Sequence, residues 1–142
     1  MTQFWDRWMR SGSRSGQTMI EFMLSAALLL LLVFGIMEMA LVVFTYNSIS
    51  NAAREASRYA IAAGPNSPAP ASTSQIQAFA MKCAPSLKLS ASDVNVSWIT
   101  DPNLSSRQDA KITVSHTYPV SVPFLPKVNL KLSSTSQMMA SQ

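Results

Sequence analysis

One long apolar run dominates the pattern of hydrophobic and polar positions along the chain. It extends from Phe22 to Phe44, and Glu38 is its only charged residue. As a helix these roughly 23 residues would span about 34 Å, and a bilayer core of about 30 Å needs roughly 20 apolar residues. The alternative, a buried core helix, needs a larger domain around it than the rest of the chain supplies. The pattern therefore predicts a transmembrane helix over residues 22–44.

The helix is predicted to continue beyond the membrane. The polar stretch Thr45–Ser50 contains neither Gly nor Pro, and Asn51–Ala60 is rich in helix-forming residues. Small residues recur there at every fourth position, a stripe suited to close packing, at Ala52, Ala56 and Ala60. Gly64 and Pro65 then supply the stop signals. One helix over residues 17–63 follows, nearly 70 Å long at about 1.5 Å per residue.

A Pro- and Ser-rich linker over residues 64–74 separates this helix from the rest of the chain. Apolar residues then recur at helical spacing, at Ile76, Phe79, Ala80 and Cys83. This predicts a short amphipathic helix from about Thr73 to Cys83, which Pro85 stops.

Four later segments alternate apolar and polar residues, as strands do. They centre on Val94–Trp98, Ile112–His116, Val120–Val122 and Val128–Leu132, with breaks at 101–103 and 124–126. One polar face on each indicates an antiparallel sheet whose other face covers a surface, here the outer half of the long helix. The tail from Ser133 either extends the last strand or frays. The predicted fold class is α+β: a long N-terminal transmembrane helix followed by a small antiparallel head, residues 75–142, with one short helix.

The formal net charge of +4 does not indicate nucleic-acid binding, because no basic stripe interleaves with aromatic residues. Arg7, Arg10 and Arg14 lie together before the apolar run. By the positive-inside rule they hold the N-terminus in the cytoplasm. We therefore expect a single-pass membrane protein whose residues after about Phe44 lie outside.

No constellation of catalytic residues is visible. His116, the single histidine, lies in a strand pattern, where a structural role is far commoner than a catalytic one. There is no Cys/His cluster with metal-ligand spacing and no glycine-rich phosphate loop. Cys83 is the one cysteine, and a role as a small buried hydrophobe is favoured over pairing between chains. We expect neither an enzyme nor a cofactor or metal.

A processing signal precedes the apolar run. Gly16 follows the basic leader, and Glu21 stands five residues after it. An ordinary secretory signal has a shorter apolar stretch with a small-residue cut site behind it. The layout instead indicates a prepilin-type site, cut at the cytoplasmic face between Gly16 and Gln17, because glycine lets the backbone lie extended in a tight site. Removal of residues 1–16 would make Glu21 the fifth residue of the mature chain.

Two acidic residues lie in or beside the predicted span. A carboxylate at mid-bilayer is unfavourable by about 2.5–3.5 kcal/mol, so a functional role is the first hypothesis for each of these residues. Glu21 would pair with the new N-terminal ammonium of a neighbouring subunit; the alternative is an interfacial residue stabilised by the positive end of the helix dipole. Glu38 either faces a partner helix or reaches the outer interface, and the second interpretation is favoured.

Three segments resemble TadE-like pseudopilins of the tight-adherence (Tad) system. They are Gly16–Phe22, Leu28–Glu38 and Tyr46–Ala60, within about residues 15–63. By this resemblance, Gly16 and Gln17 flank the cut and Glu21 with Phe22 forms the assembly segment. The residues that the resemblance offers for helix packing are Gly35, Glu38, Ala52, Ala56 and Ala60.

The resemblance implies a pilin-like fold and a minor, noncatalytic component of a bacterial Tad pilus system. Such proteins are anchored in the inner membrane, with the head periplasmic or extracellular, and a prepilin peptidase cuts them. They support assembly of the Flp pilus, a type IV pilus that serves adherence and biofilm formation. The implied partners are that peptidase, the pilin, other pseudopilins and the inner-membrane platform.

Two other functions stay open at this point. One is an uncleaved single-pass anchor that presents a ligand- or partner-binding head, which predicts a full-length mature chain. The other is a pseudopilin of a secretion or competence system, and the Ala52–Ala60 segment argues against it.

Overall fold

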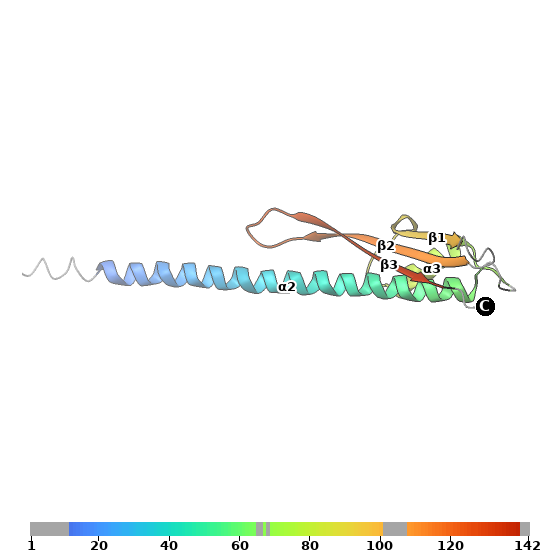
Figure 1. Ribbon diagram of the computed structural model, residues 1–142. Helices are drawn as coiled ribbons and strands as arrows, with labels where there is room; N and C mark the ends of the chain where they lie inside the picture. Colours follow the sequence, from blue (N-terminus) through green and yellow to red (C-terminus); the bar gives the residue numbers. More distant parts are fainter. Residues whose placement is uncertain (1–11, 65–66, 68, 101–107, 140–142) are drawn as a thin grey trace, which may run out of the picture.

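The computed structural model describes residues 12–64, 67, 69–100 and 108–139. The described elements are α2 (Gly12–Ala62), α3 (Thr73–Cys83), the 3-10 turn η1 (Ala91–Asp93), β1 (Val94–Thr100), β2 (Gln108–Val120) and β3 (Val128–Met138). A long helix, a short helix and a three-stranded antiparallel sheet confirm the predicted α+β class. Figure 1 shows α2 as one rod whose C-terminal half carries the sheet and α3, while its N-terminal part projects alone.

The helix α2 begins at Gly12, before residue 17, where the sequence predicted its start. No proline separates the leader from the apolar run, and a single Gly inside a helix costs only about 1 kcal/mol relative to Ala. The polar stretch after the apolar run also stays helical. Thr45 Oγ1 donates to Leu41 O at 2.8 Å and Ser48 Oγ to Phe44 O at 3.0 Å, so these hydroxyls bond within the helix instead of breaking it.

The helix ends at Ala62, one residue before the predicted end. Gly64 closes the last turn through an N–H bond to Ile61 O at 3.3 Å, and its φ is not positive, so it is not a left-handed cap. Its small size matters instead. A Cβ at this position would lie 3.2 Å from Ala60 O and 3.3 Å from Ile61 O. Pro65 lies outside the described residues.

The sheet has the order β1-β2-β3, with both neighbouring pairs antiparallel. Ile112 pairs with Val96 on one side and with Ser136 on the other. The second predicted strand segment and the start of the third are one element, because β2 runs without interruption through His116 and Tyr118 to Val120. Val122, which the sequence placed in a strand, lies in the loop. Pro119 is tolerated because β1 stops pairing at Val114, which leaves this part of β2 with β3 as its neighbour.

The last strand confirms one of the two expectations for the tail. β3 extends through Ser133 as far as Met138, and residues 140–142 lie outside the described chain. The predicted break at 101–103 also lies outside it. The break at 124–126 is confirmed as part of the loop between β2 and β3.

The core lies between the inner face of the sheet, α3 and the C-terminal half of α2, as predicted from the alternation. Its buried members come from every packed element: Ile49, Ala53, Ala56, Ala60, Ile76, Ala80, Val94, Ala110, Ile112 and Val114. Burying each Ile or Val side chain contributes about 1.5–3 kcal/mol. Alanines on α2 let the strands approach the helix closely, and α2 supplies four of the ten buried core residues on which this small head depends.

The short helix α3 has the predicted bounds. Ser72 caps its N-terminus by accepting from Gln75 N, and the Gln75 side chain in return accepts from Ser72 N at 2.9 Å. Ile76 and Ala80 face the core, and the Phe79 ring stacks on Tyr59 of α2 with centroids 4.6 Å apart. α3 therefore covers a side of α2 next to the sheet.

Candidate functional site

The N-terminal part of α2 presents a long apolar surface that nothing in the described chain covers. An 18-residue window within Gly16–Ala62 is long and apolar enough to cross a membrane, and none of that window is buried. Phe22 is 74% exposed and Leu24 63%. Exposure of so many large apolar side chains is unfavourable in water, so this surface suggests a membrane anchor.

The predicted cut site lies within α2. Gly16 is exposed, and a Cβ there would meet no atom within 4 Å. Arg7 and Arg10 of the leader lie outside the described residues. A peptidase that needs an extended backbone would have to unwind the first turns of α2, and Gly16 makes this easier because glycine disfavours a helix interior.

Glu21 and Phe22, the predicted assembly residues, both lie exposed on α2. Residues 16–25 are exposed all round the helix, so this part of α2 offers every side to a partner or to lipid. The geometry leaves the Glu21 carboxylate accessible to a second chain.

Glu38 has a partner that the sequence did not reveal. The Tyr118 hydroxyl of β2 donates to Glu38 Oε2 at 3.2 Å, and both residues are half-buried. The two residues are 80 positions apart, so no local pattern could have joined them. The carboxylate therefore meets the head of its own chain.

The predicted packing residues divide into two groups. Ala52, Ala56 and Ala60 are all 0% exposed, and the last two belong to the core under the sheet, so the alanine stripe is occupied by the chain's own head. Gly35 lies three residues before Glu38, is half-buried, and has open space where a Cβ would be. Of this set, Gly35 remains accessible for packing against another helix.

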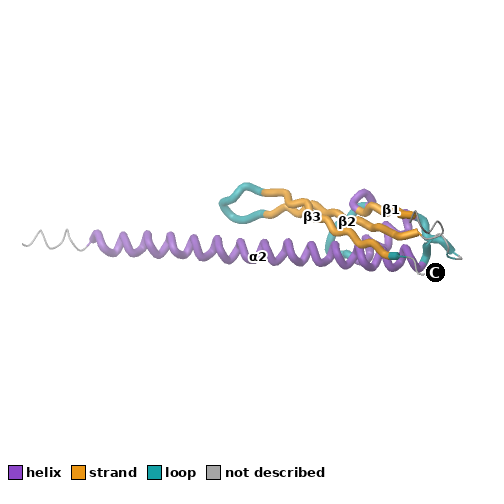
Figure 2. Tube along the Cα trace, viewed as in Figure 1, coloured by secondary structure: helices purple, strands orange, loops and turns teal. Residues whose placement is uncertain are grey.

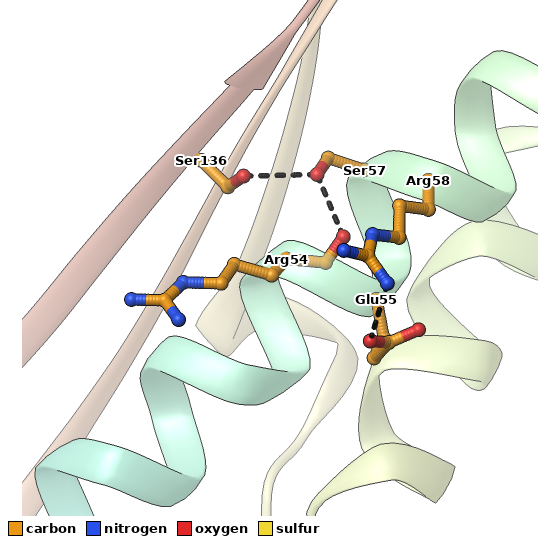
Figure 3. A network of polar contacts seen from close by, with 5 residues as sticks. All are labelled: Arg54, Glu55, Ser57, Arg58 and Ser136. Carbon is orange, nitrogen blue, oxygen red and sulfur yellow. Dashed lines mark hydrogen bonds and ion pairs between the residues drawn. The ribbon is translucent and has the colours of Figure 1, made fainter.

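A buried polar contact joins α2 to β3 (Figure 3). Ser57 is 0% exposed; its Oγ donates to Arg54 O at 2.8 Å and lies 2.9 Å from Ser136 Oγ. Since the Ser57 proton is used on the carbonyl, Ser136 is the donor in the second bond. The ion pair between Arg58 and Glu55 beside it, at 3.4 Å, joins side chains that are 65% and 40% exposed and contributes little.

Within the described residues, no group of three His, Cys, Asp or Glu side chains could hold a metal ion. Cys83 is half-buried and free of a disulfide. Burial, with the nearby Glu55 carboxylate as a second cause, raises the pKa of its thiol, and Lys82 opposes the shift. A thiol with a raised pKa is a weaker nucleophile at neutral pH. Cys83 is half-buried and not a member of the core, so the predicted role as a small buried hydrophobe is met only in part.

Residues 16–58 match the family model described as TadE-like protein. The resemblance expected from the sequence is thereby confirmed over this segment. It begins at the predicted cut site, contains Glu21, Gly35 and Glu38, and ends next to the buried Ser57. No curated protein and no solved structure matches the chain.

The TadE-like segment supports involvement in a Tad pilus system, whose TadE-like members are structural components. The matched segment covers the exposed apolar part of α2 and the first part of α2 that lies under the head. Residues from Thr73 onward, which include the head, lie outside the match. The surfaces of the head are therefore described from the structure of this chain alone.

Proposed function

We propose that the protein is a minor, pilin-like component that supports assembly of a Tad/Flp type IV pilus, and through it adherence and biofilm formation. One observation carries the proposal. The TadE-like segment combines an uncovered apolar helix, an accessible Glu21 near its start and a head packed on its far end.

A prepilin peptidase matures the chain by cutting between Gly16 and Gln17 at the cytoplasmic face. Residues 1–16 are the leader, residues 22–44 span the inner membrane, and the head of residues 75–142 lies on the outer side beyond the linker of residues 64–74. The exposure of Gly16 and the open space around it support access to this bond once the first turns unwind.

Assembly is noncovalent and uses the N-terminal part of α2. The new ammonium on Gln17 of one subunit pairs with the Glu21 carboxylate of a neighbour, in a low-dielectric surrounding where such a pair is strong. Gly35 lets a neighbouring helix approach α2 closely. Partners of this kind are the pilin, other pseudopilins and the inner-membrane platform.

N-terminal sequencing of the membrane-extracted protein, from cells with and without the peptidase, tests the maturation step. A start at Gln17 that depends on the peptidase is the expected result. A start at Met1 in both cells would contradict the proposal and favour an uncleaved anchor with a partner-binding head.

A pair of matched variants tests the assembly step. Glu21→Gln removes the carboxylate and should leave cleavage intact but strongly reduce the number of pili seen by electron microscopy. Glu55→Gln removes an acidic residue of the same helix beneath the head and should leave pili at the wild-type number. Normal piliation with Glu21→Gln would exclude the proposed contact.

A further inference from the structure

The loop between β2 and β3, residues 121–127, exposes an apolar surface at the closed end of the hairpin. Outside α2, the exposed large apolar residues of the described chain are Ile99, Met139 and four in this region: Phe124, Leu125, Val128 and Leu130. Phe124 is 97% exposed and has a φ of 67°, a left-handed conformation that bulky residues rarely adopt. These side chains contribute nothing to the head's core.

Two contacts fix the direction of this hairpin relative to α2. Ser136 of β3 contacts Ser57, while Tyr118 of β2 contacts Glu38, so the hairpin runs toward the N-terminus of α2. The loop lies further along, beyond Glu38. Figures 1 and 2 show the closed end of the hairpin reaching along α2 to where its N-terminal part begins to project alone.

The depth of the loop follows from the length of α2. Glu38 is 17 residues after Glu21, about 25 Å along the helix, whereas the hydrocarbon core is about 30 Å thick. With Glu21 at the inner edge of the core, Glu38 lies about 5 Å inside its outer edge. With the span at residues 22–44, Glu38 lies still deeper. In both arrangements the loop beyond Glu38 meets lipid.

The hairpin's helix-facing side is also partly uncovered at its closed end. Leu130 pairs with Tyr118 and Val128 with Val120, so all four side chains point to the face that meets Glu38. Even so, Leu130 is 39% exposed and Val128 56%. Exposed apolar side chains of the hairpin's closed end and of α2 thus lie at the same depth.

Charge and backbone chemistry of the hairpin fit a lipid interface. From Ala110 onward the sequence has three lysines, Lys111, Lys127 and Lys131, and no acidic residue, which suits anionic head groups. Pro123 and Pro126 carry no N–H, and Leu125 N donates to Val122 O at 3.2 Å. Three of the seven loop residues therefore leave no backbone donor to be satisfied in an apolar medium.

We infer that residues 121–127 insert into the outer leaflet of the membrane that holds α2, as a second, interfacial contact of the head with lipid. Phe124 and Leu125 enter the acyl-chain boundary, and Lys127 and Lys131 extend to the phosphates. The contact sets the height and tilt of the head above the bilayer. It rests on α2 as a membrane anchor and not on the proposed role in pilus assembly.

Site-specific fluorophores test this insertion. In a Cys83→Ala background, single cysteines are introduced by Phe124→Cys, Leu29→Cys and Asn95→Cys, labelled with an environment-sensitive nitrobenzoxadiazole dye. The full chain is reconstituted in vesicles of phosphatidylethanolamine and phosphatidylglycerol with a lipid that carries a quencher high on its acyl chain. Asn95 pairs with Thr113, level with Thr135 beside Ser136, so it reports from the head far above the loop.

The expected result is a blue-shifted, strongly quenched dye at position 124, comparable with the dye at position 29, and a water-like, unquenched dye at position 95. A dye at 124 that behaves like the one at 95, while 29 is quenched, would overturn the inference. So would a blue shift at 124 that disappears when the protein is diluted in lipid, because a second copy would then cover the loop. A water-like dye at 29 would remove the anchor on which the inference rests.

Discussion

The Tyr118 hydroxyl donates to the Glu38 carboxylate at 3.2 Å and joins β2 to the long helix. An acidic residue within an apolar run thus finds a hydrogen-bond donor on the head of its own chain. This contact joins the hairpin to α2, as the Ser57–Ser136 contact does nearer the end of the helix.

Replacement of Tyr118 by Phe removes this donor while keeping the ring. We expect the half of the β2–β3 hairpin next to the loop to open about fivefold more often. This corresponds to a loss of about 1 kcal/mol for one hydrogen bond. Hydrogen exchange of residues 116–132 in detergent micelles measures the change. Tyr46→Phe, on an exposed tyrosine of α2, is the control and should not alter exchange. Equal exchange in the wild type and both variants would show that the contact does not hold the hairpin.

Replacement of Ser57 by Ala removes the acceptor for Ser136 inside the helix–strand contact. Since Ser57 is fully buried, the head should lose about 1 kcal/mol of its free energy of unfolding, measured by urea denaturation in micelles. Ser48→Ala is the matched control, because the Ser48 hydroxyl donates to its own helix at Phe44 O. A smaller loss for Ser57→Ala than for Ser48→Ala would contradict this account.

Replacement of Ala56 by Leu tests whether the alanine stripe serves the head. Ala56 is 0% exposed under the sheet, so three extra carbons should lower the free energy of unfolding by about 1–3 kcal/mol. Ala27→Leu adds the same atoms to the exposed apolar run and should leave the head's urea midpoint unchanged. If the Ala56→Leu variant unfolded at the wild-type urea midpoint, the conclusion that the sheet packs closely on α2 at Ala56 would be contradicted.

The reactivity of Cys83 should depend on Glu55. Burial is the first cause of the raised pKa of the thiol and the Glu55 carboxylate is the second. Glu55→Gln should therefore lower the pKa and move the pH midpoint of iodoacetamide alkylation downward. Lys82→Gln should move it upward, because Lys82 favours the thiolate. Glu21→Gln lies far along α2 and serves as the control; an equal midpoint in all variants would exclude the electrostatic coupling.

The sequence predicted the elements whose signals are local. The apolar run, the period of α3 and the alternation in β1 each follow from short-range spacing, and the bounds of α3 agree at both ends. The start of α2 was misplaced because helix propagation needs only the absence of a breaker. The continuity of β2 was missed because Pro119 looks like an interruption, and its tolerance depends on where β1 ends.

What the sequence by itself determined is therefore the fold class, the long apolar helix and the segment that carries the TadE-like match. Periodicity and composition encode these, since each depends on residues within one or two turns of one another. Only the tertiary structure decided that the alanine stripe is covered by the sheet, that Glu38 meets Tyr118 and that an apolar loop lies beside the anchor. Contacts between residues tens of positions apart form when the chain packs, and no local spacing specifies them.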